Sequence, residues 1–377
     1  MVYLDNAATT LIKPDAVARS MASAVKTLAS PGRGGHEASM LAAQTAFDCR
    51  ETAAEMFGAC SPENVIFTMN ATHALNIAIR SLAGRGSRAV VSGYEHNSVM
   101  RPLHAVDADI RVARGGLFDK NAVVDSFRKE LMRGADVAVC THISNVFGFI
   151  LPIDEVAEMC RKYGVPLIID AAQSAGSETL NIEDLGASFA AMPGHKGLYG
   201  PQGTGLLLIG ENVRAQPLMF GGSGSNSELM DMPDVYPDRL EAGTHNMPGI
   251  SGLSEGIRFV RKIGEYRIKR HERRLIALAH RLLSGIGGLE LYYTEDDGTQ
   301  GGVMSFAVAD MSSEECAESL SELGIAVRAG LHCAPSAHAS AGTDKRGTVR
   351  ISVSAFNTED DIYALFDAMK RIKAKKL

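Results

Sequence analysis

Lys196 and Asp170 are side chains of the types that could act together on one cofactor. Lys196 lies among glycines in the segment Gly194-His195-Lys196-Gly197, and Asp170 directly follows the apolar run at 166–169. A lysine amine can form a Schiff base with an aldehyde, and a carboxylate can keep a pyridine nitrogen protonated so that the ring acts as an electron sink. Together the two residues predict pyridoxal 5′-phosphate (PLP) as the cofactor, with Lys196 as its point of attachment.

Each of the two residues taken alone has a simpler explanation. A carboxylate after a strand is commonly the N-cap of the next helix, and a single lysine is commonly a solubilising surface charge. The pair favours a ligand site, because such sites in open α/β sheets lie at the carboxyl ends of strands. A neighbouring pyridinium would favour the ionised form of Asp170, and desolvation or a nearby cation would favour the neutral amine of Lys196.

Two further segments follow predicted strands. The segment 70–76 lies between the apolar run at 64–68 and a helix-periodic stretch, which is the form of a phosphate cradle at a helix N-terminus. Thr72 could cap that helix and donate its hydroxyl to a phosphate, although an ordinary Thr cap without a ligand fits the segment equally well. His96 follows the run at 88–92 and could stack on the pyridine ring; a single histidine is more often structural, so this assignment depends on position.

The elements that would position these residues follow from hydrophobic periodicity. From about residue 15 to 210, short apolar runs alternate with helical patterns, which indicates strand-helix units and a mostly parallel sheet. The near-continuous hydrophobicity of the runs indicates burial on both faces, and therefore an α/β fold with helices covering the sheet. The clearest strands are predicted at 64–68, 88–92, 137–140, 166–170 and 205–209.

The C-terminal part of the chain has a different pattern. Residues 211–248 are rich in Gly, Ser, Asn, Met and Pro and predict a long irregular excursion of the kind that carries function or contacts a partner. We expect one long helix over 252–283, strands at 302–308 and 347–353, and helices at 313–323 and from 358 onward. The predicted organisation is a large PLP-binding domain (15–250) and a small α+β domain (251–377), joined by the N-terminal segment 1–14.

Composition argues against several other classes of protein. The 377 residues are 45% hydrophobic and 22% charged, as in ordinary globular proteins, and the net charge of −6 is not arranged in blocks. We therefore expect no nucleic-acid partner. No secretory leader and no apolar run of membrane-spanning length is visible, so we expect a cytoplasmic protein with no membrane partner. Six scattered cysteines without metal-ligand spacing predict reduced, mostly buried thiols and no metal site.

Several motifs occur in order along nearly the whole chain: LDNAATT (4–10), NATHALN (70–76), EHNS (95–98), HISNVFG (142–148), DAAQ (170–173), GHKGLYGPQGTG (194–205), EAGTHN (241–246) and VRAGLHCA (327–334). By these motifs the chain resembles the class V aminotransferase-like PLP enzymes, and within them the group II cysteine desulfurases and selenocysteine lyases. The resemblance implies the PLP-dependent transferase fold of type I, with a seven-stranded, mostly parallel sheet.

The resemblance also implies cofactor contacts beyond Lys196 and Asp170. Gln173 would touch the ring hydroxyl and His96 would stack on the ring. The phosphate would be held by Thr72, His73 and His195. Thr244 matches a threonine that reaches the phosphate from the neighbouring subunit, which implies a homodimer with composite active sites.

The substrate residues implied by the resemblance lie in other motifs. Asn145 and Arg350 match the residues that receive the substrate carboxylate, for which a planar guanidinium is suited. Arg33 and His36 lie in a glycine-rich segment that resembles the family's entrance segment. Two positions depart from the common pattern: Pro193 replaces a hydroxyl residue before GHK, and Leu331 replaces a histidine before Cys333.

Cys333 determines which activity the resemblance implies. Its Gly- and His-flanked setting matches the cysteine loop of group II desulfurases, whose thiolate attacks the sulfur of a PLP-bound cysteine and becomes a persulfide. His332 and Arg328 could favour that thiolate; the alternative is a buried, inert thiol. We therefore expect an L-cysteine desulfurase that releases alanine and passes sulfur to an acceptor protein. The alternatives are a selenocysteine lyase, a cysteine sulfinate desulfinase or a class V aminotransferase.

Overall fold

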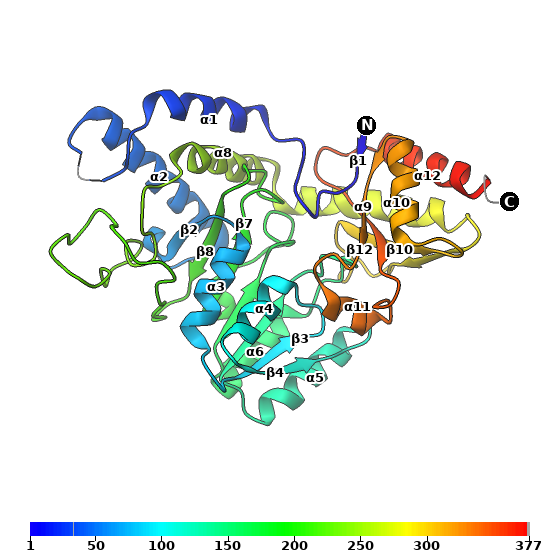
Figure 1. Cartoon of the computed structure of the whole chain (residues 1–377), viewed down its shortest axis with the longest axis horizontal. Coiled ribbons are helices and arrows are strands. Elements are labelled where there is room, and N and C mark those ends of the chain that lie inside the picture. The colour runs from blue at the N-terminus through cyan, green and yellow to red at the C-terminus, as the bar shows by residue number, and fades with distance from the viewer. Residues whose placement is uncertain (33, 375–377) are drawn as a thin grey trace.

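The computed structural model describes residues 1–32 and 34–374. Figure 1 shows a larger body, which contains the long mixed sheet and most of the helices, beside a smaller one. Both ends of the described chain lie in the smaller body, where the N-terminal strand runs close to the last helix (Figure 1). The N-terminal segment then crosses to the larger body, where the first helices lie.

The larger body is built on a seven-stranded sheet of order β2-β8-β7-β6-β5-β3-β4. Only β8 runs antiparallel to its neighbours; every other pairing in this sheet, from β7 through β6, β5 and β3 to β4, is parallel. The predicted α/β class and the seven-stranded, mostly parallel sheet are therefore confirmed. The strands are β2 (Val65–Thr68), β3 (Arg88–Ser92), β4 (Asp109–Ala113), β5 (Val137–Thr141), β6 (Leu167–Asp170), β7 (Phe189–Pro193) and β8 (Gly205–Ile209).

The strand sequences explain why helices must cover both faces of this sheet. Alternate residues of one strand enter separate cores: Leu206 and Leu208 belong to one buried cluster, and Leu207 and Ile209 to the other. This alternation follows from the two-residue period of a strand. The covering helices of the larger body are α1 (Asp15–Thr27), α2 (Glu37–Phe57), α3 (Ala71–Leu82), α4 (Asn97–Ala105), α5 (Lys120–Met132), α6 (Ile153–Tyr163), α7 (Ile182–Leu185) and α8 (Met247–Ile263).

The smaller body has an antiparallel sheet of order β12-β13-β10-β9 and a core of its own, which also takes in Leu4 from the N-terminal segment. A parallel pair of short strands, β1 (Val2–Tyr3) and β11 (Ile325–Ala326), fixes that segment. The domain limits at 14, 250 and 251 stay predictions. The remaining elements are α9 (Glu265–Leu283), β9 (Leu289–Tyr292), β10 (Val303–Val308), α10 (Ser313–Glu322), β12 (Arg328–Gly330), α11 (Pro335–Ala341), β13 (Thr348–Ser352) and α12 (Glu359–Ala374).

The single long helix predicted over 252–283 is wrong. The chain forms α8 and α9, which are separated at Gly264 with a φ of 89°. A residue in this left-handed region ends a helix, and glycine adopts it without a steric penalty. The irregular excursion predicted at 211–248 is confirmed up to residue 246, since no helix or strand lies between Ile209 and Met247, where α8 begins.

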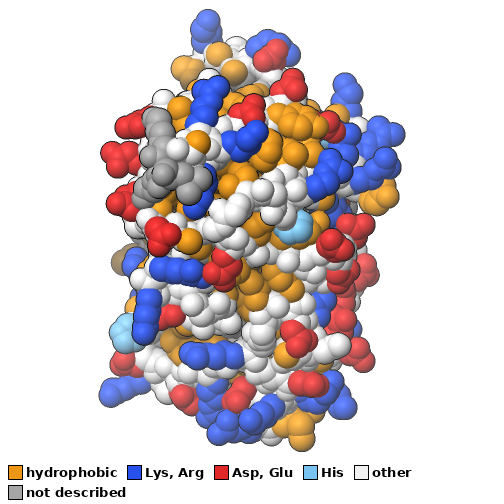
Figure 2. Space-filling view, turned by 90° about the vertical axis from the view of Figure 1, so that its right-hand side faces the viewer, with side chains coloured by type: hydrophobic (Ala, Val, Ile, Leu, Met, Phe, Trp, Pro, Cys, Tyr) orange, Lys and Arg blue, Asp and Glu red, His pale blue; other side chains and the backbone are white. Residues whose placement is uncertain are grey.

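Surface features complete the description. Basic and acidic side chains are interspersed over the face shown in Figure 2, with apolar side chains visible between them. Within the described residues, none of the helices combines the length and the apolar character needed to cross a membrane. All six cysteines are free, and Cys60 and Cys333 are the two that are exposed.

Glu272 on α9 predicts a pH-dependent stability. Burial, and to a lesser degree the neighbouring Glu178, raise the pKa of its carboxyl to about 8. The value in an unfolded chain is about 4, so the folded state holds the proton more tightly. The stabilising effect is complete below about pH 4 and is lost as the pH rises through about 8.

We expect Glu272→Gln to flatten the loss of stability between about pH 5 and 8, because the amide cannot ionise. Urea unfolding of both proteins across this range would measure the difference. Glu318→Gln, on the exposed side of α10, is the matched control. Parallel pH profiles for wild type and Glu272→Gln would contradict the expectation.

Candidate active site

Most of the predicted site residues meet in one pocket at the carboxyl ends of β3, β5, β6 and β7. The pocket has a volume of about 200 Å³ and is bordered on one side by the segment that follows β12. The predicted residues that line it are Thr72, His96, Asn145, Asp170, Gln173, His195, Lys196, Cys333 and Arg350.

Lys196 lies in a tight turn directly after β7. The turn packs against the segment that contains Gly176, and glycine is required at both contact positions. A Cβ at Gly197 would come within 2.3 Å of the Ala175 carbonyl oxygen, and a Cβ at Gly176 would come within 2.2 Å of the Gly197 carbonyl oxygen. Burial, followed by the charge of Arg350, lowers the pKa of Lys196 to about 8. The lowered pKa increases the fraction of the amine that is neutral and nucleophilic near neutral pH.

Asp170 is the last residue of β6 and is 3% exposed. Burial raises the pKa of its carboxyl, while the Ala172 N–H, which donates to Oδ1 at 2.9 Å, and Lys196 act in the opposite direction. A buried carboxylate is stabilised by a cation placed beside it. Asp170 therefore suits a ligand that presents a positive charge at this end of the pocket.

His96 is the N-cap of α4 and is held by its own helix. The Ser98 N–H donates to His96 Nδ1 at 3.0 Å, and the Ser98 hydroxyl lies 2.9 Å from the same nitrogen. Burial, followed by the charge of Lys196, lowers the pKa of His96 to about 4. The ring is therefore neutral near neutral pH, with one nitrogen occupied by the helix cap.

The N-terminus of α3 lies in the same pocket, but its cap differs from the prediction. Asn70, not Thr72, caps the helix, since its Oδ1 accepts from the His73 N–H at 2.9 Å. The Thr72 hydroxyl instead lies 2.8 Å from the Ser98 hydroxyl. His195 also lines the pocket, and its buried Nδ1 has no hydrogen-bond partner. This end of the pocket combines a helix N-terminus with side-chain donors, as anion sites do.

Arg350 on β13 is 2% exposed and already paired. Its Nη2 lies 2.7 Å from Asp5 Oδ1, and its Nη1 donates to the Asn145 carbonyl oxygen at 2.9 Å. The buried Nε has no hydrogen-bond partner. Asn145 is occupied as well, because its side-chain amide donates to the His332 carbonyl oxygen at 2.8 Å. A substrate carboxylate here would compete with Asp5 for the guanidinium.

Cys333 is exposed at the mouth of the pocket, in a loop whose backbone is unusual. His332 and Cys333 both have left-handed backbones, with φ of 51° and 56°, a conformation that few residues other than glycine adopt. The Asn97 N–H at the start of α4 donates to the Cys333 carbonyl oxygen at 2.8 Å. The loop is thus held against the helix that carries His96.

The predicted support of the Cys333 thiolate by His332 is wrong. The His332 ring is buried and neither of its nitrogens has a hydrogen-bond partner. Burial, followed by Arg350, lowers the pKa of His332 to about 2, so that the ring is uncharged near neutral pH. Arg328, the other residue predicted to favour the thiolate, lines the same pocket as Cys333.

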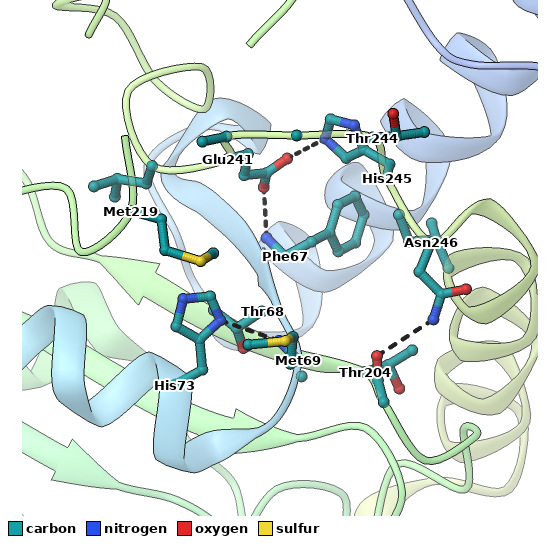
Figure 3. Close-up of a pocket in the computed structure, with 16 residues that line it drawn as sticks. Phe67, Thr68, Met69, His73, Thr204, Met219, Glu241, Thr244, His245 and Asn246 are labelled. Carbon is teal, nitrogen blue, oxygen red and sulfur yellow. Dashed lines mark hydrogen bonds and ion pairs between the residues drawn. The ribbon is translucent and has the colours of Figure 1, made fainter. Parts of the chain in front are cut away.

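Other predicted residues lie outside this pocket. His36 caps α2, where its Nδ1 accepts from the Ser39 N–H at 3.3 Å. His73 and Thr244 line a second cavity, beside Met69, Met219 and Glu241 (Figure 3). Arg33 lies outside the described residues. In the described part of the chain, no cluster of His, Cys, Asp and Glu side chains could hold a metal ion.

Sequence reasoning missed Asp5, which pairs with Arg350 and, at 3.3 Å, with Arg328 Nε. The signal that could have identified Asp5 was its place in the motif LDNAATT. Ser98, in the motif EHNS, was missed as well.

Comparison with known proteins identifies the family of this chain. The family model "Aminotransferase class-V" matches residues 2–365. This chain belongs to that family. A probable cysteine desulfurase of Methanothermobacter thermautotrophicus is 35% identical, over 98% of this chain and 94% of the relative. Another from Pyrococcus abyssi is 30% identical over 99% of this chain and 94% of the relative.

Solved structures give the same result. The apo cysteine desulfurase of Thermococcus onnurineus superposes with a TM-score of 0.90 at 30% identity, over 100% of this chain and 95% of that one. The cysteine desulfurase CsdA of Escherichia coli has a TM-score of 0.86 at 25% identity, over 98% of this chain and 94% of that one. The predicted family, the cysteine desulfurases within class V, is confirmed.

Gly197 gives a direct test of how the lysine turn is held. In Gly197→Ala the new Cβ would meet a backbone oxygen at 2.3 Å, so the turn must shift. We expect a loss of about 1–3 kcal/mol in the free energy of unfolding, as for other overpacked positions. Thermal unfolding would measure it. Gly287→Ala, where a Cβ meets nothing within 4 Å, should stay near wild type; equal effects of the two variants would refute the steric explanation.

Proposed function

We propose that this protein is a cytoplasmic, PLP-dependent L-cysteine desulfurase that converts cysteine to alanine and stores the sulfur as a persulfide on Cys333. The observation that carries the proposal is that a single pocket holds Lys196, Asp170 and Cys333. An amine, a buried carboxylate and an accessible thiol are the groups that this reaction requires.

The residues of the pocket fit PLP. Asp170 would hold the protonated pyridine nitrogen. The positive charge of that nitrogen would stabilise the buried Asp170 carboxylate. Lys196 would attach the cofactor, and Gln173 and His96 would contact the ring. The phosphate end would take the N-terminus of α3 with Thr72, together with His195, whose Nδ1 is unpartnered. Bound PLP would supply an electron sink for the bonds of the amino acid.

The His73 side chain lines the second cavity, so a phosphate role for His73 would require its backbone N–H to exchange Asn70 Oδ1 for the phosphate. Pro193 at the end of β7 lines the pocket and offers no hydroxyl. His195, Thr72 and the start of α3 would therefore make these contacts without a hydroxyl from position 193.

Arg350 and Asn145 would receive the substrate carboxylate. The free Nε of Arg350 offers one donor, and a carboxylate that displaces Asp5 from Nη2 would gain a second, which is the bidentate geometry that guanidinium favours. Arg33 and His36 would belong to the entrance of the site.

The sulfur step is balanced without an oxidant. The Cys333 thiolate forms a bond to the sulfur of the substrate, the carbon–sulfur bond breaks, and its electron pair stays on the carbon. That carbon takes a proton, for which the ammonium form of Lys196 in the same pocket is suited, and the product is alanine. The sulfur left on Cys333 would then pass to the thiol of an acceptor protein.

We also propose a homodimer with composite active sites. Thr244 is exposed in the second cavity, away from the pocket of its own subunit. Met69, Met219 and Phe220 are exposed large apolar side chains, and the first two line the same cavity. Apolar side chains gathered on a surface are typical of a protein interface. The partners expected are the amino acid, the second subunit and the acceptor protein.

The cofactor assignment predicts a visible absorption band of the purified protein that is absent in Lys196→Ala, because only an amine at this position can attach the aldehyde. Absorption spectra recorded after dialysis would measure it. Lys129→Ala is the control lysine, since Lys129 is exposed on α5 and does not line the pocket. An unchanged band in Lys196→Ala would rule out the attachment.

The nucleophile assignment predicts that Cys333→Ala slows alanine formation from cysteine at least about 100-fold, as expected when a reacting group is removed. Cys60→Ala, the other exposed cysteine, should keep wild-type turnover. Alanine and sulfide would be assayed with reductant present. Undiminished turnover of Cys333→Ala would exclude the persulfide.

A comparison of substrates separates the alternative activities. Cys333→Ala can still release alanine from selenocysteine or cysteine sulfinate, since those substrates need less help from a thiol. A wild-type kcat/KM that is higher for one of these substrates than for cysteine would instead assign a selenocysteine lyase or a desulfinase. Formation of pyridoxamine phosphate in a single turnover of the wild type would indicate an aminotransferase instead.

A further inference from the structure

The second cavity, which contains His73 and Thr244, is bordered by a buried ionic network (Figure 3). Glu241 is its centre and is 7% exposed. Its Oε1 accepts from the Phe67 N–H at 2.6 Å, and its Oε2 lies 2.5 Å from both Arg50 Nη2 and His245 Nε2. Every oxygen of this carboxylate is therefore engaged.

Arg50 completes the network from α2. It is buried, donates to the Val65 carbonyl oxygen and lies over the Phe67 ring at 4.1 Å. Burial alone opposes a charge on Glu241, yet Arg50 and His245 keep its pKa below the ordinary value. The network thus joins three segments that are remote in sequence: α2, β2 and the segment 241–246.

The segment 241–246 is held at its ends and exposed between them. Glu241 is buried, whereas Gly243 and Thr244 are exposed. Gly243 has a φ of 95°, and its N–H donates to the Gly222 carbonyl oxygen at 2.8 Å. His245, the residue after Thr244, bonds back to Glu241. Thr244 therefore lies on a turn whose two flanks are joined, because Glu241 precedes Thr244 and bonds to His245, which follows it.

We propose that Glu241, paired with Arg50, is a positioning residue for Thr244 and thereby sets the affinity of the neighbouring subunit for the cofactor phosphate. The inference rests on the proposed homodimer with composite sites. A group that acts through Thr244 affects the site of the other subunit, whereas a residue that only stabilises its own fold affects its own subunit.

The first test compares cofactor affinity. We expect Glu241→Gln and His245→Ala to raise the dissociation constant of PLP about tenfold, the effect of losing one hydrogen bond to a charged group. Dialysis of the purified holoenzymes followed by PLP titration would measure it. Glu255→Gln, whose partner Arg258 is half-exposed, is the matched control and should keep wild-type affinity. His245→Ala keeps the Arg50 pair, so it decides the outcome if Glu241→Gln does not fold.

The second test asks which subunit is affected. A Lys196→Ala subunit is mixed with a Glu241→Gln subunit, so each mixed dimer contains one site with an intact lysine facing an intact Glu241. We expect these dimers to hold PLP at that site with wild-type affinity, and an equal mixture to show about a quarter of wild-type activity at limiting PLP. Weak PLP binding at the intact lysine would mean that Glu241 acts within its own subunit, which overturns the inference.

Thr244→Ala in the same mixture separates this inference from the proposed function. If Thr244→Ala weakens the site of the partner while Glu241→Gln and His245→Ala bind PLP as wild type does, the inference is wrong and the composite site stands. If Thr244→Ala weakens only its own subunit, or has no effect, the composite site itself is wrong.

Discussion

Burial of one amine and one carboxylate in a common pocket is the constraint on which the rest of the site depends. Removal from water lowers the pKa of Lys196 to about 8 and raises that of Asp170, so each group is pushed toward its neutral form. A flat ligand with a cationic ring nitrogen and an aldehyde would satisfy both. The uncharged state of His96 follows from the same burial, and a neutral ring suits contact with a pyridinium.

The fold supplies this pocket through strand ends and close backbone contacts. Parallel strands β3, β5, β6 and β7 end at one edge, so their following residues converge there although they are far apart in sequence. Glu95, just after β3, joins two of these ends because its Oε1 accepts from the Thr141 N–H of β5 at 2.8 Å. The glycines around Lys196 allow its turn to lie directly against the residues after Asp170.

Sequence predicted the parts of the fold that have strong local signals. The five predicted strands have near-continuous apolar interiors, whereas the missed β4 alternates charged and apolar residues at the sheet edge. The missed β7 contains two alanines and a proline. Gly264 is the local signal of the helix boundary, but the helical periodicity of the apolar residues continues on both sides of it and predicts one helix. In the site, strand ends predicted Asp170 and His96, while the role of Asp5 depends on the pairing of β1 with β11, which no local pattern reveals.

The pairing of Asp5 with Arg350 places the N-terminal segment and the smaller body side by side at the pocket. Arg350 comes from β13 and Asp5 follows β1, and both are fixed by strand pairings in the smaller body. Asp5 offsets the charge of the buried guanidinium, because an unpaired buried charge is costly. In the proposed enzyme, a substrate carboxylate would take over that function, since it would bring the same charge to the same donors. Arg328, already 3.3 Å from Asp5, remains as its partner, so the exchange leaves neither carboxylate without a cation.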